Sequence, residues 1–152
     1  MLMTQEQALN TFFVETFNQI LSWEERTFAK TAFRNLSVRE FHILEAVGAL
    51  EQTKANTMTQ IAARLNVSVG ALTTAVNALV RKGYLRRQGS DEDRRLVLVY
   101  LTESGRQADM EHALFHREMV QSVVNYLTKE QLDALIVSLN RLNDFFKGKI
   151  EE

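Results

Sequence analysis

The sequence predicts a mainly α-helical fold with one small β-hairpin. Apolar residues recur at three- and four-residue steps over most of the 152 residues, which is typical of amphipathic helices. Only residues 84–101 depart from this period, because there two short runs rich in β-branched and aliphatic residues flank a polar turn. Proline is absent, so the helix boundaries have to be identified from capping residues.

Capping boxes mark the helix starts, since a serine or threonine is followed three residues later by a glutamine or glutamate. They are Thr4 with Gln7, Ser37 with Glu40, Thr57 with Gln60, and Thr128 with Gln131. Ser68 and Thr102 are expected to be further N-caps, and Gly83 to end a helix. The expected helices cover residues 5–32, 38–50, 58–65, 69–82, 103–126 and 129–149. The expected strands are 84–88 and 95–101, joined by a turn at 89–93.

Composition restricts the class of protein. Without cysteine the chain has no disulfide, thiolate metal site or thiol switch. There is no apolar run near the ~20 residues of a membrane span, and the first ten residues do not resemble a signal peptide, so a cytoplasmic location is expected. The net charge is −1, yet residues 64–95 hold seven basic and three acidic residues. Such a basic segment is typical of a phosphate-contacting surface, although a solvated charged face is the alternative.

Residues 58–82 are expected to form a helix-turn-helix, in which the second helix enters a major groove of DNA. The predicted contact between the two helices involves Ile61, Ala62 and Leu65 on one side and Val69, Leu72, Val76 and Leu79 on the other. The opposite face of the second helix carries the candidate DNA contacts, which are Ser68, Gly70, Thr73, Thr74, Asn77 and Arg81. An ordinary solvent-exposed helix face would show the same pattern, so this segment alone does not establish DNA binding.

The hairpin strengthens the case for DNA. Its turn carries Asp93, Arg94 and Arg95, and an arginine at the end of a stiff loop can enter a narrow minor groove. A neighbouring carboxylate such as Asp93 can hold the guanidinium by paired hydrogen bonds. Helix pair and hairpin together predict a winged helix-turn-helix.

Three segments resemble the MarR family of regulators: MTQIAARLNVS (58–68), NALVRKGYL (77–85) and DRRLVLVYLTESG (93–105). The resemblance implies an intertwined, triangular homodimer on a near-palindromic duplex site, with Arg95 in the minor groove and Asp93 as its support. It also implies helical dimerisation regions at 1–36 and 126–152, a DNA-binding domain at 37–102 and a connecting helix at 103–125. The family's redox-sensing branch uses an N-terminal cysteine, which this chain lacks.

The terminal segments are rich in apolar residues, since all nine phenylalanines lie outside residues 42–114. We interpret them as a dimer interface, with an ordinary intrachain core as the alternative. Within the family, Asn18–Glu25 and Glu40–His42 resemble the branch that represses fatty-acid biosynthesis genes. That resemblance implies a long-chain acyl group on acyl carrier protein as corepressor.

The histidines suggest a different effector. His112 and His116 are four residues apart on one helix, a spacing that can chelate a metal. With Glu24 and His42 they resemble the ligands of the zinc-responsive branch of the family. Phe41 stands where that branch has a second acidic ligand, and the cysteine of its secondary site is absent. Histidines that are structural or line an effector pocket are the alternative.

An enzyme is not expected. The His112–His116 pair lacks the glutamate that zinc hydrolases place after the first histidine, where Ala113 stands. There is no phosphate-binding glycine loop, and no nucleophile has a base nearby in sequence. A module that binds only protein would leave the basic hairpin tip unexplained.

Overall fold

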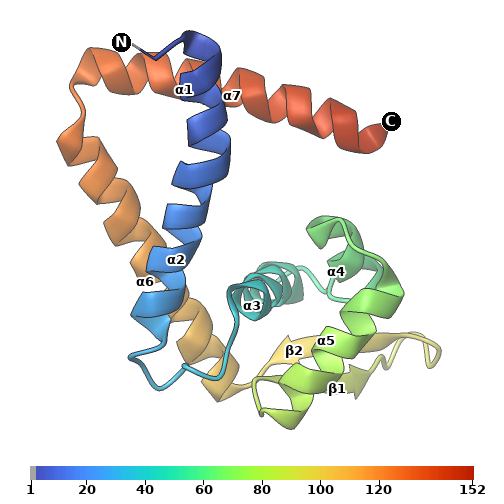
Figure 1. Ribbon diagram of the computed structural model, residues 1–152. Helices are drawn as coiled ribbons and strands as arrows, with labels where there is room; N and C mark the ends of the chain where they lie inside the picture. Colours follow the sequence, from blue (N-terminus) through green and yellow to red (C-terminus); the bar gives the residue numbers. More distant parts are fainter. Residues whose placement is uncertain (1–2) are drawn as a thin grey trace. The chain divides into compact units, whose positions relative to one another are not determined.

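The computed structural model describes residues 3–152 and confirms the predicted mainly α-helical fold (Figure 1). In chain order the elements are α1 (Gln5–Thr11), the π-helix η1 (Phe12–Thr16), α2 (Phe17–Phe28), α3 (Val38–Glu51), α4 (Met58–Leu65), α5 (Val69–Arg81), β1 (Leu85–Gly89), β2 (Val97–Leu101), α6 (Glu103–Tyr126) and α7 (Lys129–Glu151). The chain forms two compact units, one ending at His112 and the other consisting of Ala113–Glu152. Among the helices of residues 3–152, none has the length and apolar character needed to cross a membrane.

The helix starts are where the capping residues predict them. In all four capping boxes the hydroxyl of the N-cap residue accepts a hydrogen bond from the backbone amide three residues later. The side chain of that later residue accepts one from the backbone amide of the N-cap residue. The Ser68 hydroxyl accepts from the Ala71 amide, and the Thr102 hydroxyl accepts from the Gly105 amide, both at 3.1 Å. These bonds satisfy amides that lack partners within the helix, so local sequence determines these boundaries.

The first helix differs from the prediction of one uninterrupted helix over residues 5–32. The π-helix at Phe12–Thr16 interrupts it, and α2 ends at Phe28. At this end the Thr31 hydroxyl donates to the Phe28 carbonyl at 2.8 Å and accepts from the Phe33 amide at 3.1 Å. Such side-chain bonds compete with the helical pattern, and the chain turns away from the helix after Phe28.

The core of the first unit lies between α3, the α4–α5 pair and the hairpin. Its fully buried side chains include Phe41, Leu44, Ile61, Leu72, Val76, Leu79, Leu85 and Val99. The predicted contact between α4 and α5 is therefore largely confirmed. Val69 is the exception, because it is 44% exposed. As the first residue of α5 it covers the preceding turn rather than the helix contact.

The β1–β2 hairpin is antiparallel, with Leu85 opposite Leu101 and Gly89 opposite Val97. Its strands begin later than predicted, and the connecting loop covers residues 90–96. Within that loop the Ser90 amide donates to the Leu96 carbonyl, and the Leu96 amide donates to the Asp93 carbonyl, both at 3.0 Å. These bonds close the end of the hairpin, so Arg94 and Arg95 lie in the loop and not on a strand.

Gly83 joins α5 to the hairpin in a left-handed conformation, with a φ of +84°. Its amide donates to the Val80 carbonyl, and the next amide, of Tyr84, donates to the Leu79 carbonyl. This pair of bonds is the Schellman motif, which favours glycine at this position. The predicted helix stop is confirmed, and it directs the chain from α5 straight into β1.

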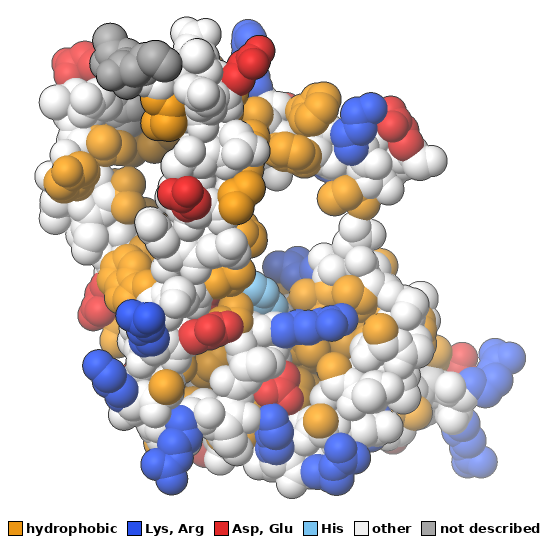
Figure 2. Space-filling view, viewed as in Figure 1, with side chains coloured by type: hydrophobic (Ala, Val, Ile, Leu, Met, Phe, Trp, Pro, Cys, Tyr) orange, Lys and Arg blue, Asp and Glu red, His pale blue; other side chains and the backbone are white. Residues whose placement is uncertain are grey.

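The second unit leaves most of its apolar side chains uncovered. Helix α7 has 23 residues and none of them is buried. Its exposed large apolar side chains are Leu135, Ile136, Val137, Leu139, Phe145, Phe146 and Ile150. Hydrophobic side chains at the surface are visible in Figure 2.

Candidate nucleic-acid interface

The exposed face of α5 is a narrow stripe opposite its buried residues. Gly70, Thr74, Asn77 and Arg81 are exposed and follow one another at steps of four, three and four residues. Because three or four residues make about one helical turn, these side chains lie on one face. The opposite face packs into the core, so this stripe is the part of α5 that is exposed along the length of the helix.

Most side chains on this stripe are short, and two hydroxyls bond to their own helix. Thr73 is half-buried and donates to the Val69 carbonyl at 2.8 Å, while Thr74 donates to the Gly70 carbonyl at 3.4 Å. A Cβ atom added at Gly70 would meet nothing within 4 Å, so the space beside this glycine is open. The predicted DNA contacts on α5 are thus at the surface, with Ser68 acting as N-cap.

Asn77 has a partner that the sequence analysis did not identify. Nη2 of Arg87, on β1, donates to Oδ1 of Asn77 at 2.6 Å. Arg81, one turn further along α5, is exposed. A hydrogen bond to a charged donor is stronger than one between neutral groups, so Arg87 holds the Asn77 amide in one orientation.

At the end of the hairpin, Asp93 holds Arg95. Asp93 Oδ1 accepts from the Arg95 backbone amide at 3.0 Å and from Nε at 3.3 Å. These hydrogen bonds lower the pKa of Asp93 from its usual value. The Arg95 side chain is nevertheless 90% exposed, against 37% for Asp93. Arg94 beside it is also exposed, and basic side chains project from this end of the hairpin in Figure 2.

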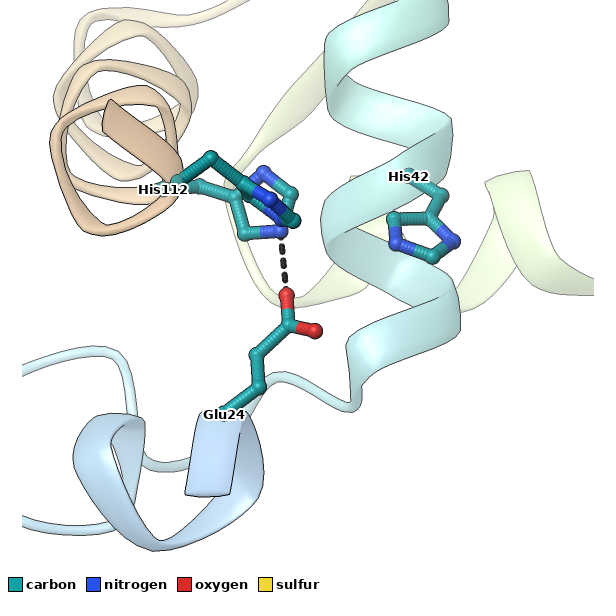
Figure 3. A group of neighbouring side chains, drawn as sticks. Glu24, His42 and His112 are labelled. Carbon is teal, nitrogen blue, oxygen red and sulfur yellow. Dashed lines mark hydrogen bonds and ion pairs between the residues drawn. The ribbon is translucent and has the colours of Figure 1, made fainter. Parts of the chain in front are cut away.

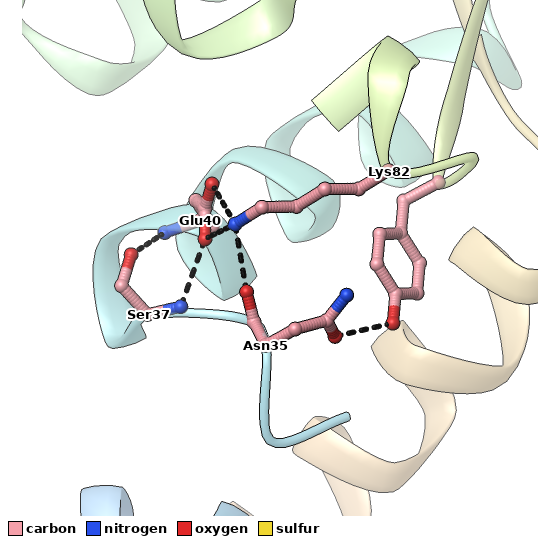
Figure 4. Close-up of polar contacts among 5 residues, drawn as sticks. Asn35, Ser37, Glu40 and Lys82 are labelled. Atoms are coloured by element: carbon pink, nitrogen blue, oxygen red, sulfur yellow. Dashed lines mark hydrogen bonds and ion pairs between the residues drawn. The ribbon is translucent and has the colours of Figure 1, made fainter. Parts of the chain in front are cut away.

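A polar network ties the end of α5 to the start of α3 (Figure 4). Lys82 Nζ donates to both carboxylate oxygens of Glu40 at 2.9 Å and to the Asn35 carbonyl at 2.7 Å. Glu40 is also the reciprocal partner in the Ser37 capping box. Tyr84 adds a fourth contact, because its hydroxyl donates to Asn35 Oδ1 at 2.7 Å. One glutamate therefore caps α3 and holds Lys82, the residue that directly follows α5.

Glu24, His42 and His112 are the candidate metal ligands that belong to the first unit, and they lie close together (Figure 3). The ligand atoms of Glu24 on α2, His42 on α3 and His112 on α6 lie within 4.8 Å of one another. His112 Nε2 and Glu24 Oε1 are 2.5 Å apart, and these residues are 1% and 2% exposed. The fourth candidate, His116, follows four residues later on α6 and makes an edge contact with Phe115.

Aromatic rings enclose His112. Its ring stacks on Phe41 at 5.0 Å between centroids with an interplanar angle of 9°, and it lies 5.8 Å from the Phe28 ring. Phe41, which replaces an acidic ligand of the zinc-responsive branch, thus packs against one of the candidate ligands. The arrangement can serve as a partial metal site or as a buried hydrogen-bonded pair.

Next to this cluster lies a group of carboxylates. Asp109 is half-buried on α6, and burial together with the negative charge of Glu45 raises its pKa, with Glu51 adding to the effect. His112 and Arg106 oppose this shift. Glu51 is itself well satisfied, since it accepts from Arg106 Nη1 at 2.5 Å and from the Leu101 amide at 3.0 Å.

Sequence reasoning placed Arg86 and Arg87 on the first strand of the hairpin, but it found neither the contact of Arg87 with Asn77 nor the Lys82 network. Alternation along β1 places Arg86 and Arg87 on opposite faces of the hairpin, so the face of Arg87 could have been predicted. The contact with Asn77 depends on how β1 packs against α5. Lys82 and Glu40 are 42 residues apart, and no local pattern brings them together.

Residues 34–96, which include α3, the α4–α5 pair, β1 and the loop that follows it, match the MarR family. Among curated relatives, the HTH-type transcriptional regulator YwhA of Bacillus subtilis is 29% identical over 86 residues, covering 57% of this chain and 62% of YwhA. YpoP of the same organism is 36% identical over 72 residues, covering 47% of this chain and 49% of YpoP. The chain thus spans about half to three fifths of these relatives. Both are transcriptional regulators, in agreement with the exclusion of an enzyme.

Solved structures match over a longer range. Streptococcus pneumoniae FabT in complex with DNA is 32% identical, with a TM-score of 0.87 and coverage of 95% of this chain and 99% of FabT. The Staphylococcus aureus MepR–DNA complex has the same fold, with a TM-score of 0.76 at 19% identity, covering 91% of this chain and 97% of MepR. From the likeness to FabT over almost the full length of both chains, and from the match of residues 34–96, the chain belongs to the MarR family of winged helix-turn-helix transcription regulators.

Proposed function

We propose that this chain binds double-stranded DNA sequence-specifically, with α5 in a major groove and the 90–96 loop in the adjacent minor groove. One observation carries the proposal: Arg95 is held by Asp93 while 90% of its side chain is exposed. Within the protein this geometry leaves the guanidinium facing solvent. A narrow minor groove, with its negative potential, is the environment in which such an arginine binds.

The protein acts as a homodimer in this proposal. No side chain of the 23-residue helix α7 is buried within the chain, and helices gain most of their stability from the packing of an apolar face. An uncovered apolar face of this size marks an interaction surface. A second copy of the chain fits best, because two copies related by a two-fold axis present two α5 helices to a near-palindromic site.

Salt titration of the purified protein on a selected duplex tests DNA binding. Contacts to several phosphates release counterions, so the affinity should fall about a thousandfold between about 50 and about 200 mM salt. A single dominant sequence should emerge from selection on a random duplex library. If selection enriches no sequence, or if the affinity does not change with salt, the proposal is wrong.

The effector we favour is a long-chain acyl group carried on acyl carrier protein, acting as corepressor of fatty-acid biosynthesis genes. Support comes from the likeness of Asn18–Glu25 and Glu40–His42 to that branch of the family, and from the 32% identity to FabT. Addition of acyl carrier protein that carries a long-chain acyl group should raise the affinity of this protein for DNA. Unacylated carrier protein is the matched control, and an equal response to both would contradict this assignment.

Zinc is the second candidate effector, because Glu24, His42 and His112 bring two imidazoles and a carboxylate together. These are donors that Zn²⁺ prefers, and the family resemblance adds His116 as a fourth ligand. When bound, the ion would fix α2, α3 and α6 relative to one another through Glu24, His42 and His112. Calorimetric zinc titration after chelator treatment should show one site that His112→Ala removes. If the heat of zinc binding is the same for His112→Ala as for the wild type, the histidines have a structural role.

A further inference from the structure

Two adjacent arginines of β1 have different partners. Arg86 pairs in register with Tyr100 and its guanidinium lies over that ring, 4.6 Å from the centroid. Arg87 pairs with the buried Val99, on the hairpin face that also carries Leu85, and from there it reaches Asn77 of α5. Alternation along the strand therefore directs Arg86 to Tyr100, within the hairpin, and Arg87 to Asn77, on α5.

The partner of Arg87 determines how Asn77 presents its amide. A guanidinium has five N–H donors and no acceptor, so the atom of Asn77 that faces it must be the oxygen. The amide nitrogen lies on the other side of the same carbon and points away from Arg87. Asn77 is exposed on the stripe of α5, so it offers a ligand its two N–H donors and the one lone pair of the oxygen that Arg87 leaves unused.

This orientation matters for base reading. An unconstrained asparagine pairs with adenine by donating to N7 and accepting from the N6 amino group. An amide oxygen has two lone pairs, and Arg87 occupies one of those of Asn77, so one remains for that amino group. The hydrogen bond from the charged guanidinium polarises the amide, which makes its oxygen a weaker second acceptor and its N–H groups stronger donors. Guanine presents two acceptors, N7 and O6, at the same edge and therefore suits a side chain whose N–H groups are its stronger partners.

We infer that Arg87 is a specificity-determining residue, which positions the Asn77 amide so that it prefers guanine to adenine at the base pair it faces. The inference rests on the proposed function, since it requires that α5 enters a major groove. Arg87 acts through Asn77, and its remaining N–H groups stay available for phosphate.

A selection experiment with the full-length protein tests this role, using a duplex library with a randomised core. The proteins compared are the wild type, Arg87→Ala, Arg87→Lys, Asn77→Ala and the control Arg86→Ala. Arg86→Ala removes the same charge from the adjacent residue without touching Asn77. Circular dichroism melting checks that each variant is folded, which is expected because both arginines are exposed.

The wild type should select guanine at one position of each half-site, and Asn77→Ala should flatten the preference there. Arg87→Ala should shift that same position towards adenine, with the guanine-to-adenine ratio falling about tenfold. Arg87→Lys keeps a charged donor and should retain part of the preference, while Arg86→Ala should leave the base profile unchanged.

Two results would overturn the inference in distinguishable ways. If Arg87→Ala and Arg86→Ala both lower the affinity for every sequence and leave the base profile intact, Arg87 is a phosphate contact and the DNA-binding function stands. If the wild type enriches no sequence, the proposed function itself fails, and the role of Arg87 fails with it.

Discussion

At the residue scale, the arginine that we propose to enter the minor groove is ordered before any ligand arrives. Arg95 is exposed in the 90–96 loop, yet Asp93 fixes it through three hydrogen bonds. Immobilising a long side chain on binding costs about 1 kcal/mol. The Asp93 contact removes part of that cost, so it should contribute to affinity without touching DNA.

Arg95→Ala should weaken DNA binding about tenfold and leave the melting temperature unchanged. Asp93→Ala keeps the arginine but frees it, and should therefore weaken binding less, by about fivefold. Fluorescence anisotropy on the selected duplex measures both. Equal affinities for the wild type and Arg95→Ala would exclude the 90–96 loop from the DNA interface.

Asp109 is a residue where charge opposes stability. Its pKa is raised in the folded chain by burial and by neighbouring carboxylates, so its ionised form destabilises the fold at pH values above that pKa. Asp109→Asn should therefore raise the melting temperature at neutral pH. The gain should shrink as the pH falls towards about 4, where the wild-type carboxyl is protonated as well. A lower melting temperature for the variant at pH 7 would show that Arg106 and His112 dominate.

At the element scale, helix starts and the contact between the neighbouring helices α4 and α5 could be predicted from sequence, whereas contacts between residues far apart in the chain could not. Ser37, Thr57 and Thr128 cap the helices that their sequence motifs mark, because a capping box is a bond between residues three apart. The contact of Lys82 with Glu40 depends on tertiary packing. Interruption of the first helix by η1 was missed for a related reason, since apolar periodicity reports the buried face and not the hydrogen-bond pattern.

The candidate site divides in the same way. Exposure of Thr74, Asn77 and Arg81 follows from the helical period, and the Asp93–Arg95 pair from two positions in one tight loop. Arg87 was absent from the candidates because its role depends on a helix ten residues away in sequence. The family resemblance suggested that Glu24, His42 and His112 lie close together. Neither their spacing in the sequence nor the composition would have indicated this.

Among the glycines of the described chain, Gly105 has the least room for a side chain. It lies in the first turn of α6, directly after the hairpin. A Cβ atom at Gly105 would lie 2.1 Å from the Tyr84 carbonyl oxygen, which is backbone and cannot move aside cheaply. Gly105→Ala should lower the free energy of unfolding by about 2 kcal/mol. Gly148→Ala is the matched control, because nothing lies within 4 Å of that site and alanine favours a helix. Equal stability of both variants in urea would contradict this reading.

At the scale of the whole molecule, α7 should gain its stability from a partner chain. Leu139→Glu places a charge on its apolar face and should convert the dimer to a monomer, with loss of high-affinity DNA binding. Asn140→Glu adds the same charge on a different face of the helix and should leave the dimer intact. Sedimentation velocity distinguishes the species. A monomeric wild type, or a dimeric Leu139→Glu, would refute the proposed interface.

The 90–96 loop and α7 belong to different compact units of the chain, and this division has a genetic consequence. A chain that carries a damaged Arg95 keeps every residue of α7, so it should still pair with undamaged copies in the same cell. Each mixed dimer would then bring one intact and one damaged DNA-binding domain to an operator that requires two intact ones. Lesions at the wing should therefore be dominant over the wild-type allele, whereas lesions that abolish pairing through α7 should be recessive.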